Sequence, residues 1–271
     1  MNVLKFTLSG KTAFFKKPDV NSYFYFTYGH IHKIALLGIF GAIMGYGGYN
    51  QQVRNGNAVY PEFYEKLREI KISIVPKEAV NEAYQPAVPR RNDRQKGYFN
   101  KKVQIFNNTV GYANADGNLI VKEQWLENPC WDIYLILQGE VEEEIAKRII
   151  NSRATYIPYL GKNDHPAKIS HAEIVEMELI SLDQSFCMDS LYLKDCFKIC
   201  LEDDDKLFDM DEDIEITFKY EERLPVELEE ATNQYITAPF AYTNSKVMFN
   251  QSETAKKTIV GCCQGKCLQF Y

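Results

Sequence analysis

The stretch Val3-Leu4-Lys5-Phe6-Thr7-Leu8-Ser9-Gly10 alternates apolar with polar residues, and an apolar stretch, 33–44, follows it along the chain. A period of two is typical of a half-buried strand, so we expect the chain to open with one. Residues 33–44 are apolar and rich in small side chains, which predicts a buried helix ended by the glycine cluster 45–48. Within it, Gly38 and Gly41 would let the helix lie close against a sheet.

A strand–helix–strand order then occurs twice along the chain. Besides the opening elements, it comprises predicted helices over 60–70 and 141–150 and predicted strands over 71–75, 131–137 and 174–182. This order predicts an α+β fold of the ferredoxin-like, RRM type, an antiparallel sheet with helices on one face that can bind RNA on its exposed strands.

Two further patterns complete the expected architecture. Residues 103–106 and 119–121 flank a turn-rich stretch that contains Asp116-Gly117, which predicts a β-hairpin inserted between the two halves. Strands are also expected over 193–201 and 214–220, and 261–271 is either a final strand or an interface tail. We expect one elaborated domain over 1–271, with 165–271 as acidic C-terminal strands.

Charge is distributed unevenly along the chain, whose net charge is −6. Residues 1–102 carry 16 Lys and Arg against 7 Asp and Glu, whereas residues 103–271 carry 15 against 30. Phosphate contacts depend on local positive potential, so a basic N-terminal part can bind RNA within an acidic protein. The alternative is that both parts are simply solvated surface.

Basic residues interleaved with aromatic residues are the best binding signal in the sequence. Ammonium and guanidinium groups neutralise phosphates, and flat rings stack on unpaired bases. The cations are Lys16-Lys17, Arg90-Arg91, Arg94, Lys96 and Lys101-Lys102, and the rings are Phe14, Phe15, Tyr23, Tyr25, Tyr98 and Phe99. The alternative for the rings is that they belong to the core.

The candidate nucleotide-binding and metal-binding motifs each lack a residue that the ligand requires. Gly48 is followed by Tyr49-Asn50 and not by the Lys-Ser/Thr of a phosphate-binding loop. The acidic run 202–213 has Ile214 where a calcium loop requires glycine. The seven cysteines lack a compact Cys-x₂-Cys zinc knuckle and are expected to stay reduced, so neither a metal nor a cofactor is expected. The apolar run 34–44 is about half of what a membrane span needs, and a cytoplasmic protein is expected.

His30, His32 and Lys33 lie together at the entrance to the first predicted helix. Histidine and lysine side chains can act as general acid or base in metal-independent RNA cleavage. The alternative, which we favour, is a helix N-terminus whose polar side chains cap the backbone or contact phosphate.

Several segments resemble the CRISPR-associated family-five proteins. The opening residues 4–23 look like the start of that family, and 28–43 is similar to its first helix, although the entry there is usually proline-rich and His30 and Lys33 depart from this. Residues 123–129 and 156–162 also resemble it. The resemblance covers about the first 165 residues, and its overall character is that of subtype I-B.

The resemblance implies a role as the subunit of a type I Cascade complex that caps the 5′ handle of the guide RNA (crRNA). It implies a ferredoxin-like core with a protruding thumb, which the basic linker and hairpin of 84–122 fit. The implied partners are the crRNA, the Cascade backbone subunit and the large subunit, with target DNA reached through the complex. The residues expected to contact RNA are Lys16, Lys17, Asn21, Tyr23, His30, Lys33, Arg90, Arg91, Arg94, Lys96, Lys101, Lys102 and Lys162.

Catalysis is not expected. Members of one subtype cut precursor RNA with a Tyr at the end of the first helix and an adjacent Lys-His pair. Here Met44 stands at about that position, and the chain contains no Lys-His dipeptide. Two other hypotheses remain: a metal-independent endoribonuclease that uses His30 or His32 as its base, and a protein–protein scaffold whose basic part meets an acidic partner.

Overall fold

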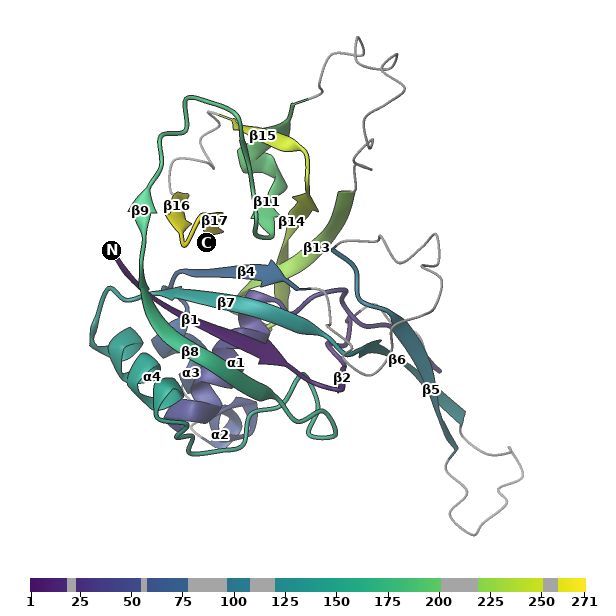
Figure 1. The fold of residues 1–271 in the computed structure, drawn as a ribbon. Coiled ribbons are helices and arrows are strands. Elements are labelled where there is room, and N and C mark those ends of the chain that lie inside the picture. Colours follow the sequence, from purple (N-terminus) through teal and green to yellow (C-terminus); the bar gives the residue numbers. More distant parts are fainter. Residues whose placement is uncertain (19–22, 55–57, 78–96, 108–119, 201–218, 251–257) are drawn as a thin grey trace, which may run out of the picture.

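The computed structural model describes residues 1–18, 23–54, 58–77, 97–107, 120–200, 219–250 and 258–271. Its central element is a four-stranded antiparallel sheet in the order β4-β7-β1-β8 (Figure 1). The strands are β1 (Asn2–Ser9), β4 (Ile72–Pro76), β7 (Cys130–Ile136) and β8 (Lys168–Glu176). With α1 (Lys33–Met44) after β1 and α4 (Glu140–Ile150) after β7, the order is ferredoxin-like, as the sequence predicted.

The helices cover one face of this sheet (Figure 1). They include the short α2 (Tyr49–Arg54) and α3 (Glu62–Leu67) besides α1 and α4. Helix α4 carries acidic residues in its first turn and Lys147 and Arg148 in its last, which suits the helix dipole. Arg148 also donates from Nη1 to the carbonyl of Ile43 at 3.0 Å, which ties α4 to the end of α1.

The core beneath the helices joins residues that are distant in sequence. Leu4, Phe6 and Leu8 of β1 are fully buried with Ile133 and Leu135 of β7 and with the inner side of α1. Phe6 and Phe40 meet edge to face, with their ring centroids 6.2 Å apart. The alternation along β1 therefore decides which side chains face the helices.

The opposite face of the sheet is covered by C-terminal strands. The hairpin of β16 (Ile259–Cys263) and β17 (Lys266–Phe270) packs Leu268 and Phe270 against Val3 and Tyr134 of the sheet. Strand β9 (Glu178–Leu179) pairs with β16. Because this face is covered, the expectation of RNA binding on the exposed strands of the central sheet is wrong for this part of it.

The other C-terminal strands form two small antiparallel sheets, β10-β15-β12 and β11-β14-β13. Their bounds are β10 (Phe186–Cys187), β11 (Tyr192–Leu193), β12 (Phe197–Ile199), β13 (Lys219–Leu228), β14 (Tyr235–Thr243) and β15 (Lys246–Phe249). A single turn of 3₁₀ helix, Lys194–Cys196, separates β11 from β12. Leu224 and Leu228 of β13 reach the core beside α1.

A two-stranded ribbon projects from the body (Figure 1). Strands β5 (Lys101–Asn107) and β6 (Ile120–Glu127) pair antiparallel from Lys101 opposite Leu126 to Asn107 opposite Ile120. The base of β6 also pairs with β2 (Thr12–Ala13) and β3 (Phe24–Tyr25), so the ribbon is anchored to the N-terminal segment. The predicted inserted hairpin is confirmed, and its Asp116-Gly117 turn lies outside the described residues.

Several element boundaries differ from the prediction. The helix expected over 60–70 is only Glu62–Leu67, and the strand expected over 193–201 is broken by the 3₁₀ turn. Most of the strand expected over 214–220 lies outside the described residues. Strands β14 and β15 were not predicted, and 261–271, expected as one final strand or an interface tail, forms most of the β16–β17 hairpin. Within the described residues, no helix is long and apolar enough to cross a membrane.

Candidate nucleic-acid interface

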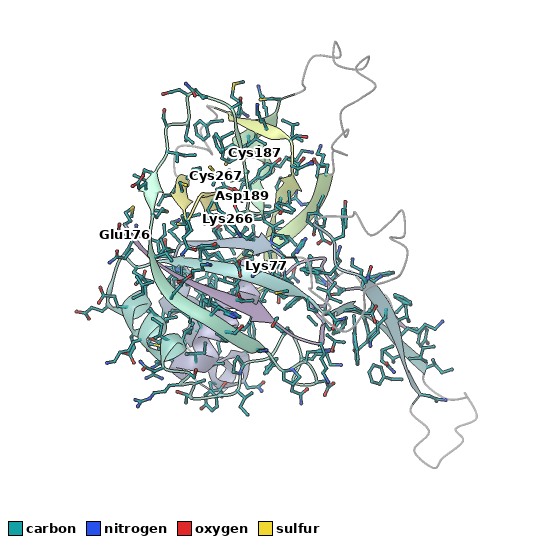
Figure 2. The ribbon with its side chains drawn as sticks, viewed as in Figure 1. Lys77, Glu176, Cys187, Asp189, Lys266 and Cys267 are labelled. Atoms are coloured by element: carbon teal, nitrogen blue, oxygen red, sulfur yellow. The ribbon has the colours of Figure 1, made fainter. Side chains whose placement is uncertain are left out.

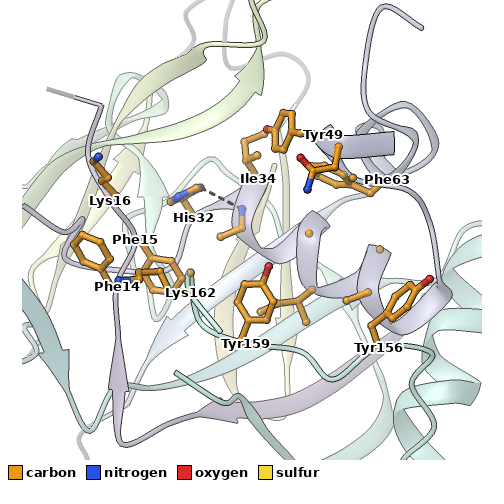
Figure 3. A pocket seen from close by; sticks show the side chains of 18 of the residues that line it. Phe14, Phe15, Lys16, His32, Ile34, Tyr49, Phe63, Tyr156, Tyr159 and Lys162 are labelled. Carbon is orange, nitrogen blue, oxygen red and sulfur yellow. Dashed lines mark hydrogen bonds between the residues drawn. The ribbon is translucent and has the colours of Figure 1, made fainter. Parts of the chain in front are cut away.

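A half-open groove of about 940 Å³ runs along the outer side of α1 (Figure 3). Its walls come from three parts of the chain: the N-terminal segment Phe14–Lys16 with Tyr25, the segment around Tyr49, and the loop Tyr156–Lys162. These parts are distant in sequence, so the groove is a product of the fold.

The floor of the groove is the glycine-containing side of α1. A Cβ atom built on Gly38 would meet no heavy atom within 4 Å, so this position opens into free space. A Cβ atom on Gly41 would lie 2.6 Å from Cβ of Phe63, so Gly41 permits close packing against α3. The prediction that both glycines lie against a sheet is therefore wrong: Gly41 packs on a helix, and Gly38 borders the groove.

Aromatic rings line the groove on both sides of the helix. Figure 3 shows Tyr49 and Phe63 across α1 from Tyr156 and Tyr159. The exposed fractions of Tyr156, Tyr159 and Tyr49 are 59%, 48% and 43%. Rings with this exposure can stack on unpaired bases, at about 1–3 kcal/mol for each base.

The loop that carries two of these tyrosines is fixed against the N-terminal segment. The amide of Phe14 donates to the carbonyl of Leu160 at 3.0 Å. Gly161 has φ +92°, and a Cβ atom there would lie 1.8 Å from the carbonyl oxygen of Phe14, so only glycine fits. The wall of the groove is therefore preformed.

Lys16 and Lys162 line the groove near the start of α1, and Lys17 follows Lys16 without lining it. Lys17 and Lys162 are paired with carboxylates. Lys17 pairs with Glu222 at 2.5 Å, and Lys162 pairs with Glu123 at 2.9 Å. Lys16 is exposed, and its ammonium lies 3.8 Å from the ring centroid of Tyr25. Among the described residues no carboxylate lies within ion-pair distance of Lys16, which leaves its charge available to a phosphate.

His30 does not reach the groove. Its ring is fully buried, Trp131 donates to its Nδ1 at 3.1 Å, and its Nε2 therefore carries the proton and donates to the carbonyl of Gly97 at 2.8 Å. Burial lowers the pKa of His30 to about 4, so the ring is neutral. The predicted RNA contact of His30 is wrong for this structure, because its side chain offers no surface to a ligand.

His32 is the N-cap of α1, as the favoured alternative predicted. Its Nδ1 accepts from the amide of Ala35 at 3.3 Å, and burial lowers its pKa to about 3. Lys33 is 7% exposed, and burial lowers its pKa to about 8. Little of the Lys33 side chain is therefore left at the surface, which argues against the predicted phosphate contact.

The remaining predicted RNA-binding residues fall into two groups. Tyr23, Lys101 and Lys102 are exposed near the base of the ribbon, where Lys102 lies 3.9 Å from Glu127. Asn21, Arg90, Arg91, Arg94 and Lys96 lie outside the described residues, so their roles stay predictions. Sequence reasoning missed Tyr49 and Gly38 as parts of the groove, and it missed Glu123 and Glu222 as the counterions of the lysines.

Comparisons with known proteins give structural likenesses only. No family model matches the chain, and no curated protein matches it. The chain is similar to a "CRISPR protein from Archaeoglobus fulgidus" (TM-score 0.48, 10% identity, 99% of each chain covered). It is also similar to a chain of a "CRISPR RNA-guided surveillance complex" (TM-score 0.46, 11% identity, 91% of each chain).

A third likeness is to a chain of a "Type III-B Cmr-beta bound to cognate target RNA and AMPPnP" (TM-score 0.45, 11% identity, 92% of this chain and 86% of that one). All three TM-scores are below 0.5 and the identities are near 10%. The function of this chain has therefore to be inferred from its own residues.

Proposed function

We propose that this protein is a non-catalytic RNA-binding subunit of a CRISPR type I Cascade complex, of subtype I-B, and that it caps the 5′ handle of the crRNA. The observation that carries the proposal is the preformed groove along α1. It combines exposed tyrosine rings, a floor open at Gly38 and a cation, Lys16, that pairs with no carboxylate of the described residues. The segments 4–23 and 156–162, which resemble the family-five proteins, each contribute residues to a wall of the groove.

The groove suits single-stranded RNA better than a duplex. Exposed rings bind bases only when the bases are unpaired, and a lysine at the mouth can neutralise a backbone phosphate. The 5′ handle of a mature crRNA is a ligand of this kind. In the proposed complex, the backbone and large subunits dock on other surfaces of the protein, and target DNA is reached only through them.

The environment of the two histidines supports a non-catalytic role. A general base works best when its pKa lies near the working pH. Burial lowers the pKa of His30 and His32 to about 4 and about 3, and each ring already has a structural hydrogen bond. Neither is suited to take a proton from a ribose hydroxyl.

The test is one gel on which purified protein is incubated with labelled precursor or mature crRNA in the absence of metal. The proposal requires binding that depends on the 5′ handle and leaves the RNA intact. A handle-scrambled RNA of equal length is the control. Equal binding of both RNAs would refute handle capping. Site-specific cleavage that disappears in a His30→Ala/His32→Ala variant would make the protein an endoribonuclease.

A further inference from the structure

Four of the seven cysteines, Cys187, Cys262, Cys263 and Cys267, lie together in the C-terminal region, away from the groove. All seven are free thiols in the structure. Cys262 lies directly opposite Cys267 in the β16–β17 hairpin. Cys187 is among the neighbours that raise the pKa of Cys267, and Figure 2 shows these two residues in the same part of the molecule as Asp189. Nothing in the proposed RNA-binding function uses these thiols.

The geometry of the hairpin places the Cys262 and Cys267 side chains on the same side. The turn residues Gln264 and Gly265 have φ 49° and 77°, as in a two-residue type I′ turn. Such a turn is closed by a hydrogen-bonded pair, here Cys263 and Lys266, so the next pair, Cys262 and Cys267, is not hydrogen-bonded.

The hydrogen bonds of Cys267 agree with this assignment. Its amide donates to Oδ2 of Asp189 at 2.8 Å, and its carbonyl accepts from the amide of Asp189 at 2.8 Å. Both backbone groups of Cys267 therefore point away from β16. In a non-hydrogen-bonded antiparallel pair the Cα atoms are about 4.5 Å apart and the side chains are close. Disulfides span Cα separations of about 4.4–6.8 Å, so this pair can be bridged without moving the backbone.

We infer that Cys262 and Cys267 form a reversible disulfide site. Both are half-buried and can be reached from solvent, whereas the neighbouring Cys263 is fully buried among Leu268 and Phe270. With oxidised glutathione as the oxidant, one thiolate attacks the glutathione disulfide and releases one reduced glutathione. The second thiolate attacks the mixed disulfide and releases another. Two protein thiols are oxidised to one disulfide, and one glutathione disulfide is reduced to two thiols.

The reaction is expected to be faster in mild alkali. The thiolate is the attacking species, and burial, together with the neighbouring Cys262, raises the pKa of Cys267. The bridge would fix the hairpin that covers the sheet, and it would be lost again in a reducing cytosol.

The test uses the full-length protein, treated with oxidised glutathione at pH 8, alkylated and digested with trypsin. Cleavage after Lys257 and Lys266 gives the peptides 258–266 and 267–271. The expected product is these two peptides joined by a bond that dithiothreitol breaks, with two fewer free thiols per chain.

Two matched variants assign the bond within the first peptide. The joined product is expected to disappear in Cys262→Ser and to persist in Cys263→Ser. Peptide 267–271 joined instead to the peptide that contains Cys187, or no joined product in the unsubstituted protein, would overturn the inference. If a variant fails to fold, fragmentation of the joined peptides from the unsubstituted protein between Cys262 and Cys263 gives the same assignment.

Discussion

A Gly38→Leu substitution, which would place a side chain in the groove, tests RNA binding without disturbing folding. Gly38 lies in the interior of α1, and a Cβ atom there has no neighbour within 4 Å, so a methyl group meets no steric barrier and a longer side chain would extend from it into the groove. Replacing an unstrained helical glycine with Ala or Leu stabilises a helix by about 0.5–1 kcal/mol. Gly38→Leu is therefore expected to unfold at the same or a higher denaturant concentration than the unsubstituted protein.

The same substitution is expected to weaken RNA binding. A leucine side chain on the floor would occupy the space between the tyrosine rings that the proposal assigns to a base. Losing one stacked base costs about 1–3 kcal/mol, which raises Kd about 5- to 150-fold. Gly38→Ala is the matched control, because it gains the same helix propensity but adds only a methyl group.

The assay is fluorescence anisotropy with a labelled 5′-handle RNA, combined with urea unfolding of each variant. The expected pattern is weaker binding by Gly38→Leu, nearly unchanged binding by Gly38→Ala, and stability at or above the original in both. If Gly38→Leu is stable and binds with unchanged Kd, the groove does not hold the RNA. If Gly38→Leu is destabilised, the open environment inferred for this position is wrong.

Three further predictions follow from the charged and titratable residues. Lys16→Gln should weaken handle binding and reduce the slope of log K against log salt concentration by about 0.7, the value for one phosphate of a single strand. The control is Lys198→Gln, which replaces an exposed lysine on β12 and should change neither quantity. Equal effects of both substitutions would contradict a specific contact of Lys16. Because the folded-state pKa values of His30 and His32 lie below that of an unfolded histidine, the unfolded chain takes up protons first, and the free energy of unfolding should fall by about 2 kcal/mol for each histidine between pH 7 and 5. Urea titrations of His32→Asn, in which the asparagine can keep the N-cap, should show a smaller fall in the free energy of unfolding. If this variant and the unsubstituted protein show the same pH dependence, the buried neutral ring of His32 is contradicted. Burial lowers the pKa of Lys33 to about 8, so the unfolded chain holds this proton more tightly than the folded protein does. The free energy of unfolding should therefore rise by about 2 kcal/mol from pH 7 to 9.5. Lys33→Met should abolish this rise in the same titration, and a rise of equal size in the variant would assign it to other groups.

The fold could be predicted because its signals are local. Helix α1 was predicted over its whole length, since the apolar run 33–44 is followed by Gly45, which adopts φ 85° and ends the helix. The ribbon was predicted from two short apolar runs on either side of a turn-rich stretch. Strands β14 and β15 were missed because their burial comes from packing against distant elements. Whether the chain is a single domain stays a prediction.

The site could be predicted only in part, because it depends on contacts between distant residues. Sequence shows His30 beside a helix start, but its burial depends on Trp131, which is 101 residues away along the chain. Sequence shows two glycines in α1, but only the packing of Phe63 distinguishes Gly41 from the open Gly38. The sequence of segment 156–162 does not show that it forms a wall of the groove, because that role depends on its contact with Phe14.

The sequence indicated a basic N-terminal part and an acidic remainder, but the fold brings charges of the two parts together. The basic and acidic parts are not separate surfaces, because Glu222 and Glu123 of the acidic part pair with Lys17 and Lys162. A phosphate that approached either lysine would compete with a carboxylate already at 2.5–2.9 Å. Among the described residues that line the groove, Lys16 is then the cation with most to gain from RNA. Binding in the groove should therefore depend more on stacking than on charge, with a salt dependence shallower than the number of lysines alone would suggest.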